Sequence, residues 1–412
     1  MNSALTVRVP DVLLSVLLAA AFAVAFAVVP LITLVLICLF STVLAGSSSR
    51  GVFLLAACLL FTLLNISKEV EGDLINYVYL QQYLANQSIL TFLDGDELRT
   101  ITGSYRETEL GFFLPLWVLA HLFGAGRVVI AVGATLAIYI PTYFGLAALA
   151  RIERWNERLM MTVTLVVFFA AVNFNLGTHL LRQHVSSALV FLGLMFAIGG
   201  RKWPALLLAL AACSIHNGTA MIVADFLVVL KLFPYEQPRK PKPWSLLLRA
   251  LVVVGLVGVS VVGIALREWE LEKPTDATEI TIWHYVFGAV LFTLFWYFSR
   301  VYARVTKANY YISVAFGIVF TVSLVFFLAG LPLLSLRYYM YLEWLFGPAL
   351  AGILCAIPRR NPLSYIGSRW ALCAVALLIF LIRIHNSAWS YGPGQSAIFT
   401  EDAVQLTQYM AN

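Results

Sequence analysis

The sequence is poor in charged residues and cysteines, and each shortage excludes a class of protein. Only 12% of the 412 residues are charged, which is too few for an ordinary water-soluble domain. The five cysteines lie inside or at the edge of apolar segments, without a C-x-x-C motif or a Cys/His cluster, so neither a disulfide framework nor a zinc site is expected. The net charge of +6 comes from short segments between apolar runs and does not indicate a nucleic-acid partner.

Apolar residues make up 61% of the chain, and their runs repeatedly approach the roughly 20 residues that cross a bilayer as a helix. The runs are continuous rather than alternating, so helices are the expected spanning structure. The sequence therefore predicts an all-α polytopic membrane protein, with residues 1–412 as a single integral membrane domain and about 12 or 13 spans. The clearest runs are residues 12–29, 31–44, 51–66, 128–150, 159–172, 185–198, 226–232, 246–266, 285–298, 311–331, 341–357 and 370–384.

Arginine and lysine recur on every second connection, which predicts that those connections face the cytoplasm. They lie at residues 151–158, 201–202, 239–242, 300–307 and 359–369, and the Pro/Lys-rich loop 234–244 is one of them. The acidic stretch 67–109 is then expected outside if residues 110–123 do not cross. Residues 110–123 are apolar but short and contain Pro115, which favours an interfacial or re-entrant helix. Residues 67–123 are therefore predicted to form an outer loop with interfacial helices.

Unusual polar residues gather on the predicted outer face. They are Asp73, Glu109, Arg182, His184, His216 and Arg337. Polar residues with purely structural roles would be expected on both leaflets, so this convergence predicts an extracytoplasmic site. Asp225 and Glu343 also lie inside apolar runs, and Asp225 is expected to be buried and paired.

Three of these residues are candidates for a general base. Asp73 follows the third span and shares a helical face with Tyr77, although it could equally be a helix N-cap. Glu109 precedes the short apolar helix and could also be only a cap. His216 follows an apolar run, 205–212, that is too short to cross, and it lies at an interruption where the helix is expected to break at membrane depth.

Two arginines are candidates for binding an anion. Arg182 is predicted on the first turns of the helix that contains 185–198, where a charge normally faces protein or a wet cavity. Arg337 lies at the outer start of a late span, followed by tyrosines that are typical of an interfacial belt. Two guanidinium groups on one side suit capture of phosphate oxygens, which suggests an anionic lipid headgroup.

The order of these motifs resembles the EpsG family of bacterial exopolysaccharide polymerases, relatives of the Wzy-type polymerases. The resemblance covers roughly residues 50–345 and leaves out the helices before Gly51 and after Ile357. The motifs are Asp73-x3-Tyr77, Glu109-x-Gly111-Phe112, Arg182 at the head of a helix, Ser214-Ile-His216-Asn-Gly218 and Arg337-x3-Tyr341. The resemblance implies a GT-C-like glycosyltransferase fold and functional roles for Arg182, His216 and Arg337. His184 matches none of its motifs.

The resulting hypothesis is a polymerase in the bacterial inner membrane whose active site faces the periplasm or exterior. Its partners would be an undecaprenyl-linked oligosaccharide donor and acceptor, membrane lipids and a chain-length regulator. Arg182 and Arg337, with Tyr77, His184 and Tyr341, would bind substrate, and Asp73, His216 or Glu109 would deprotonate the acceptor hydroxyl. No cofactor is predicted. No metal is predicted either, because Asp94-Gly-Asp96-Glu97 lies far from the helix end.

Two other classes of function fit the same residues. One is a lipid-linked sugar transferase that adds a single sugar. The other is a flippase or transporter of the lipid-linked sugar, which often contains paired repeats with interrupted helices. No convincing repeat relates residues 1–200 to 201–412, so the sequence favours an enzyme.

Overall fold

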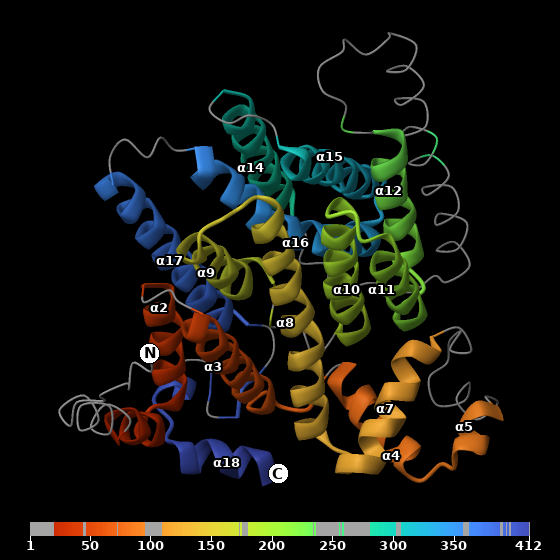
Figure 1. The fold of residues 1–412 in the computed structure, drawn as a ribbon. Helices are drawn as coiled ribbons and strands as arrows, with labels where there is room; N and C mark the ends of the chain where they lie inside the picture. The colour runs from red at the N-terminus through yellow and green to blue at the C-terminus, as the bar shows by residue number, and fades with distance from the viewer. Residues whose placement is uncertain are drawn as a thin grey trace, which may run out of the picture.

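The secondary-structure elements in a computed structural model of this protein are helices (Figure 1). The structure describes residues 20–43, 47–71, 73–94, 109–172, 174, 180–233, 235, 255, 258, 281–301, 306–356, 362–387, 390–392, 394 and 397–411. The elements of the first half are α2 (Pro30–Val43), α3 (Ser47–Ile66), α4 (Asp73–Ala85), α5 (Ile89–Asp94), α7 (Leu110–Phe123), α8 (Arg127–Ile152), α9 (Glu157–Val166), a π-helix (Val167–Ala171) and α10 (Leu181–Ile198). Those of the second half are α11 (Lys202–Ile215), α12 (Thr219–Leu232), α14 (Ile282–Val301), α15 (Lys307–Leu328), α16 (Pro332–Ala356), α17 (Pro362–His385), a 3₁₀ helix (Ala397–Phe399) and α18 (Ala403–Ala411).

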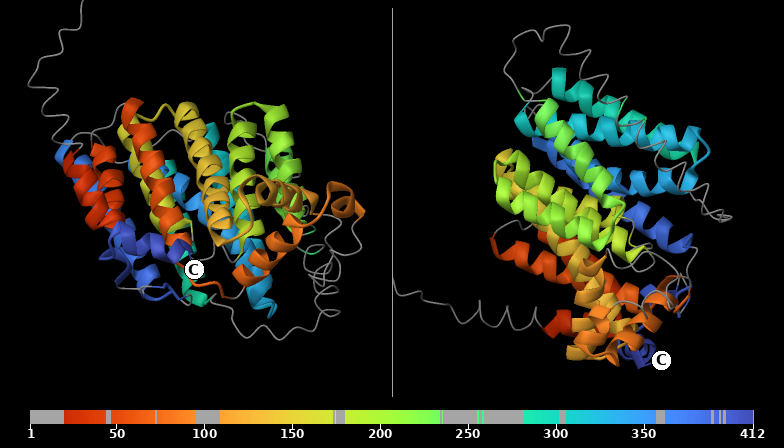
Figure 2. Two further views of the ribbon diagram at one scale, coloured as in Figure 1. Left: turned by 90° about the horizontal axis from the view of Figure 1, so that it is seen from below. Right: turned by 90° about the vertical axis from the view of Figure 1, so that its right-hand side faces the viewer.

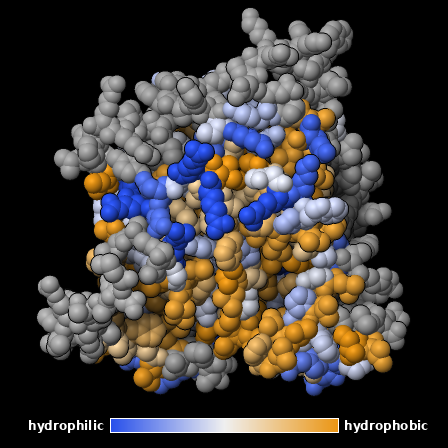
Figure 3. Space-filling view, in the orientation of Figure 1, coloured by the Kyte–Doolittle hydropathy of each residue, from blue (hydrophilic) through white to orange (hydrophobic). Residues whose placement is uncertain are grey.

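The prediction of an all-α polytopic membrane protein is confirmed. Five of the described helices are long and apolar enough to cross a membrane, and they lie in α3, α8, α10, α15 and α17. Shorter apolar helices accompany them, among them α2, α7 and α11. On the face drawn in Figure 3, hydrophobic residues cover most of the surface below a band of hydrophilic ones, as expected for a bundle that lies in lipid. The predicted span 246–266 falls outside the described residues, except for Gly255 and Gly258.

The helices α4 and α7, from the segment predicted as an outer loop, lie at one end of the bundle. Figure 2 (left) shows α4 and α7, in orange, across the lower ends of the upright helices α8, α10 and α11, with the C-terminus at the same end. α4 and α7 share a small core of their own, which includes Leu74, Tyr77, Phe112 and Leu116 and extends to Leu181 at the start of α10. The apolar segment 110–123 is thus a 14-residue helix docked on the bundle, as Pro115 and its length indicated.

One predicted boundary was wrong. The late span predicted from residue 341 begins at Pro332, so Arg337 lies within the second turn of α16. The predicted interruption at His216 is confirmed, because α11 ends at Ile215 and α12 begins at Thr219. The apolar run 205–212 lies within α11, which has 14 residues, is too short to count among the candidate spans, and runs alongside α10 (Figure 2).

Small residues allow the helices to approach closely. A Cβ at Gly347 of α16 would lie 2.0 Å from Cγ2 of Val167 in the π-helix, and one at Gly145 of α8 would lie 2.6 Å from the ring of Phe191 in α10. Hydrogen bonds add to this packing, because Trp344 of α16 donates to Thr142 of α8 at 3.0 Å. Close contact and interhelical hydrogen bonds are the interactions that hold helices together in lipid.

We expect Gly347→Ala to lower the stability of the protein by about 1–3 kcal/mol, the usual cost of overpacking a core. Val167 is fully buried, so its methyl groups have no space into which to move. Thermal unfolding of the purified protein in detergent measures the effect. Gly51→Ala in α3 is the matched control, because a Cβ there meets nothing within 4 Å. Equal losses in the two variants would contradict this account.

Candidate active site

The carboxylate of Glu109 is at the centre of the candidate site. Glu109 lies directly before α7 and is buried, with 5% of its surface exposed. Its side chain makes no capping hydrogen bond to α7, so the alternative role of a helix cap does not apply. A carboxylate removed from water in this way needs charged or hydrogen-bonding partners.

Three groups from distant parts of the sequence supply those partners. Arg182 at the start of α10 donates from Nη1 to Oε2 of Glu109. His216 places Nδ1 at 3.3 Å from Oε1, and the backbone N–H of Asn217 donates to the same oxygen at 3.2 Å. The structure therefore brings Glu109, Arg182 and His216 into direct contact, as the predicted convergence requires.

These contacts lower the pKa of Glu109. Burial acts in the opposite direction and raises it, but the hydrogen bond from His216, the positive charge of Arg182 and the hydrogen bond from Asn217 together outweigh burial and bring the pKa to about 2. The group is thus an anion at neutral pH. A carboxylate with so low a pKa accepts a proton poorly, so Glu109 is poorly suited to the role of general base.

Arg182 lies between the helices α4 and α7 and the rest of the bundle. Its guanidinium lies 5.9 Å from the centre of the Phe112 ring of α7, and it forms a hydrogen bond with Tyr77 of α4. The side chain keeps 30% of its surface exposed, compared with 7% for Glu109. The arginine is thus fixed on one side by Glu109 and remains accessible to a ligand on the other.

Glycine at position 111 makes this arrangement possible. A Cβ on Gly111 would lie 2.1 Å from Oγ of Ser214 and 3.0 Å from its backbone carbonyl carbon. The start of α7 therefore packs directly on the end of α11, two residues before His216. This contact holds Glu109 against the 216–218 turn, in which the His216 ring covers Gly218 with Nε2 at 3.0 Å from a Cβ built there.

Comparison with known proteins agrees with this site. A sequence model of the EpsG family matches residues 50–383. The chain belongs to the EpsG family. No curated protein and no solved structure matches it. The EpsG family is a Wzy-type polysaccharide polymerase family, so membership supports a polymerase-type role in polysaccharide biosynthesis. The predicted end of the resemblance was wrong, since the EpsG match continues to Arg383 and includes most of α17.

The remaining predicted residues divide into two groups. Tyr77 is part of the site through Arg182. Arg337 is linked to it through its backbone, because Nε2 of Gln183 donates to the Arg337 carbonyl at 2.7 Å. α4 begins at Asp73, whose side chain lies outside the described residues. The proposed functions of these residues in substrate binding and catalysis stay predictions.

His184 and Tyr341 are buried in the helix packing instead of lining the site. His184 has none of its surface exposed and packs edge-on against Trp344, with ring centres 5.6 Å apart. The Tyr341 hydroxyl lies 2.8 Å from Oγ1 of Thr219 and 3.3 Å from Oγ of Ser186, so it joins α16 to α12 and α10. The structure thus shows both residues bracing the bundle, and substrate contact by either stays a prediction.

Sequence reasoning missed a buried lysine at the same end of the bundle. Lys68 follows α3, is fully buried, and donates to Oδ1 of Asn65 and to the carbonyl of Phe174, both at 2.9 Å. Burial lowers the pKa of Lys68 to about 7. The signal in the sequence was a lysine just after an apolar run, and such a lysine usually lies at the solvated end of a helix.

Asp225 is buried as expected, but its Oδ2 has no hydrogen-bond partner among the described residues.

Within the described residues, no group of three His, Cys, Asp or Glu side chains could hold a metal ion. The predicted absence of a metal requirement stays a prediction, because the segment that contains Asp96 and Glu97 lies outside the described residues.

We expect the ionised carboxylate of Glu109 to stabilise the fold at neutral pH and to lose this effect at acidic pH. Its pKa falls from about 4.3 in the unfolded chain to about 2 in the folded protein. The ionised group therefore stabilises the fold fully above about pH 5, and the effect is lost as pH falls from 4.3 towards 2. Melting temperatures of wild type and Glu109→Gln should differ by a constant amount from pH 5 to 8 and converge below pH 4. A gap that widens on acidification would show that the carboxylate is not held in this way.

Gly111→Ala should uncouple Glu109 from its partners. We expect the substitution to cost about 1–3 kcal/mol, because the clash involves backbone and cannot be relieved by rotating Ser214. In this background Glu109→Gln should cost much less than it does in wild type, as measured by thermal unfolding in a double-mutant cycle. Gly133→Ala is the control, because a Cβ there meets only the end of the Leu119 side chain. Additive losses for Gly111→Ala and Glu109→Gln would contradict this coupling.

Proposed function

We propose that this EpsG-family chain is a polymerase that joins undecaprenyl-pyrophosphate-linked oligosaccharide units at the outer face of the bacterial inner membrane. The observation that supports this most directly is the contact of Glu109 with Arg182 and His216, at the end of the bundle that the basic loops predict to be outside. A partly exposed cation and an imidazole beside a buried anion are the groups that transfer of a sugar from a phosphate requires.

Arg182 would stabilise the charge that develops on the leaving group. When the bond between the anomeric carbon and the phosphate oxygen breaks, the electron pair stays on the pyrophosphate. Fixed cationic donors aimed at such a charge are among the largest contributions to catalysis. Glu109 would hold the guanidinium in place before the reaction, and Arg337 would bind the same phosphate groups.

His216 would act as the general base. Its Nδ1 faces the carboxylate of Glu109, and a carboxylate accepts hydrogen bonds, so Nδ1 carries the proton and Nε2 is the basic nitrogen. Nε2 would take the proton of the acceptor hydroxyl as its oxygen bonds to the anomeric carbon. This is the arrangement in which a buried carboxylate orients a histidine and stabilises its protonated form.

We expect Arg182→Ala to abolish polymer formation in cells. Cells that lack this chain would be rescued with wild type, Arg182→Ala, His216→Ala or the control Arg201→Ala, and their surface glycan would be separated by gel. Arg201 is an exposed arginine at the other end of α10, so its variant should restore the full ladder. Loss of one stabilising donor commonly costs about 100-fold or more in rate, which should reduce the ladder to single units.

Other outcomes would support a different function. A normal ladder with Arg182→Ala at wild-type protein levels would rule out this mechanism. A ladder that lacks a single sugar or substituent would favour a transferase that makes one addition. Accumulation of lipid-linked units on the cytoplasmic side would favour a flippase.

A further inference from the structure

The turn that joins α7 to α8 leaves its backbone open on one side. α7 ends at Phe123 and α8 begins at Arg127, with Gly124, Ala125 and Gly126 between them. Both glycines have a positive φ, 83° at Gly124 and 157° at Gly126, which residues with a side chain rarely adopt. A Cβ at either glycine would meet nothing within 4 Å. A ligand can therefore approach the backbone of this turn closely.

The N-terminus of α8 lies at this turn. α8 has 26 residues, and its N-cap Gly126 provides no side-chain hydrogen bond to the helix. The N–H groups of the first turn have no partner within the helix, and their partial positive charge favours an anion. Many helices share this property, so the evidence for a ligand comes from two neighbouring side chains.

The first of these, Gln81 of α4, holds a donor without an acceptor against the helix end. The residue has none of its surface exposed, and its Oε1 accepts a hydrogen bond of 2.9 Å from the backbone N–H of Gly126. This bond fixes the orientation of the amide, because the reversed amide would place two donors face to face. Its Nε2 then has no hydrogen-bond partner among the described residues. A buried donor in this state is costly, so the position favours an acceptor from a ligand.

The second side chain, Arg127, lies on the same side of α8. It shares a helical face with Ile130 and Ala134, and both of these belong to the small core that α8 forms with α4 and α7. Side chains on a helix lean towards its N-terminus, so the guanidinium of Arg127 extends over the turn. Its Nε and Nη2 are buried and have no hydrogen-bond partner among the residues that the structure describes.

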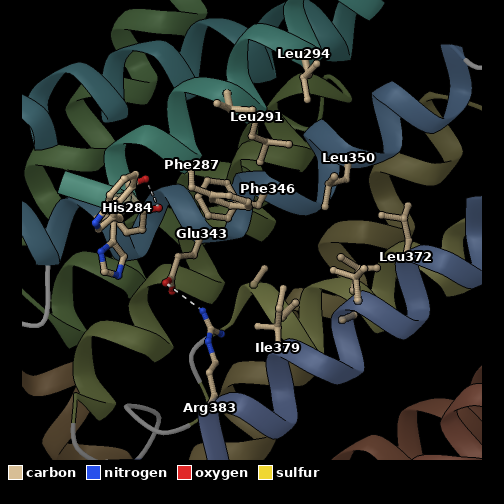
Figure 4. Close-up of a pocket in the computed structure, with 18 residues that line it drawn as sticks. His284, Phe287, Leu291, Leu294, Glu343, Phe346, Leu350, Leu372, Ile379 and Arg383 are labelled. Atoms are coloured by element: carbon tan, nitrogen blue, oxygen red, sulfur yellow. Dashed lines mark hydrogen bonds and ion pairs between the residues drawn. The ribbon is translucent and has the colours of Figure 1, made fainter. Parts of the chain in front are cut away.

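Other arginines of the bundle have acidic partners within it. Arg182 contacts Glu109 in the candidate active site. In a second polar cluster, Arg383 lies 3.8 Å from Glu343 beside an apolar cavity of about 510 Å³ that α14, α16 and α17 enclose (Figure 4). Within the described part of the chain, Arg127 has no such carboxylate. The turn therefore brings together donors and a positive charge that the described residues do not neutralise.

The position of the turn along the bundle favours a lipid as the source of the anion. The candidate membrane span of α8 begins at Arg127, so the turn lies where hydrocarbon meets the headgroup region. Directly before it, Leu122 and Phe123 have 68% and 70% of their surfaces exposed, as expected for side chains in contact with acyl chains. The phosphate groups of phospholipids lie at the same depth as the turn.

We infer that the turn between α7 and α8 binds the phosphate of an anionic phospholipid, which accepts hydrogen bonds from the Arg127 guanidinium, Nε2 of Gln81 and the first N–H groups of α8. The oxygens of a phosphate can accept from several donors at once, and a guanidinium binds such a group through two parallel hydrogen bonds. These residues are distinct from Glu109, Arg182 and His216. The inference is therefore independent of the proposed function.

Native mass spectrometry of the full-length protein, released from detergent, counts bound lipids and measures their Kd. We expect the first molecule of phosphatidylglycerol to bind more tightly than phosphatidylcholine. Arg127→Gln should weaken this binding about tenfold, the effect of losing a hydrogen bond to a charged group. Arg151→Gln is the matched control, because it removes the same charge from the exposed opposite end of α8 and should leave the Kd unchanged.

Gln81→Glu tests the same site from α4. The glutamate keeps an oxygen that accepts from the Gly126 N–H, but a second oxygen replaces the Nε2 donor. This variant should therefore also weaken phosphatidylglycerol binding about tenfold. Melting temperatures of all variants without lipid verify that each one is folded.

Three results would overturn the inference. Equal losses in Arg127→Gln and Arg151→Gln would show a response to net charge and not to this turn. Wild-type affinity in Gln81→Glu would place the bound lipid elsewhere. Stabilisation of wild type, but not of Arg127→Gln, by millimolar inorganic phosphate, without any preference for phosphatidylglycerol, would identify free phosphate as the ligand in place of a lipid.

Discussion

The burial of one carboxylate determines how α7 joins the membrane bundle. An isolated ion at this depth costs several kcal/mol, so Glu109 is stable only where Arg182, His216 and Asn217 reach it. Those three groups belong to α10 and to the turn before α12, whereas Glu109 directly precedes α7. The interaction that positions the candidate catalytic groups is therefore also the one that docks α7. Any change that moves α7 changes the electrostatics of the site as well.

The helix α16 connects the helices that surround this site. One of its faces bonds to α10, α8 and α12 through the backbone of Arg337 and the side chains of Trp344 and Tyr341. Glycine at position 347 lets the same helix approach the π-helix, where a regular residue would clash. Extra turns of π-helix are common at functional sites, and here Ala170 and Ala171 of the π-helix line the cavity between α14, α16 and α17. Packing on α16 thus shapes both polar clusters.

Much of the fold and of the candidate site could be predicted from the sequence, but not which residues would be in contact. The helix class, Arg182 at the head of α10 and the interruption at His216 all follow from local hydropathy and charge. The partner of Arg182 does not, because Glu109 lies 73 positions away and only the packing of Gly111 on Ser214 brings it there. The burial of His184 could have been anticipated, since residues two apart on a helix point in different directions and Arg182 already faces the site. Glu343 stood out within an apolar run, but its neighbour Arg383 is 40 positions further on and was assigned to no site.

The two polar clusters of the bundle differ in how far the protein itself satisfies their carboxylates. At the first, Glu109 is in contact with Arg182 and His216, and Arg182 keeps 30% of its surface exposed. At the second, Oε1 of Glu343 lies 3.8 Å from Arg383, and its Oε2 has no hydrogen-bond partner among the described residues. α16 lies between the two, because Tyr339 and Glu343 line the cavity beside α14 and α17, whereas Tyr341 bonds to α10 and α12. Packing on α16 therefore keeps the groups proposed to act on a substrate apart from the carboxylate of Glu343.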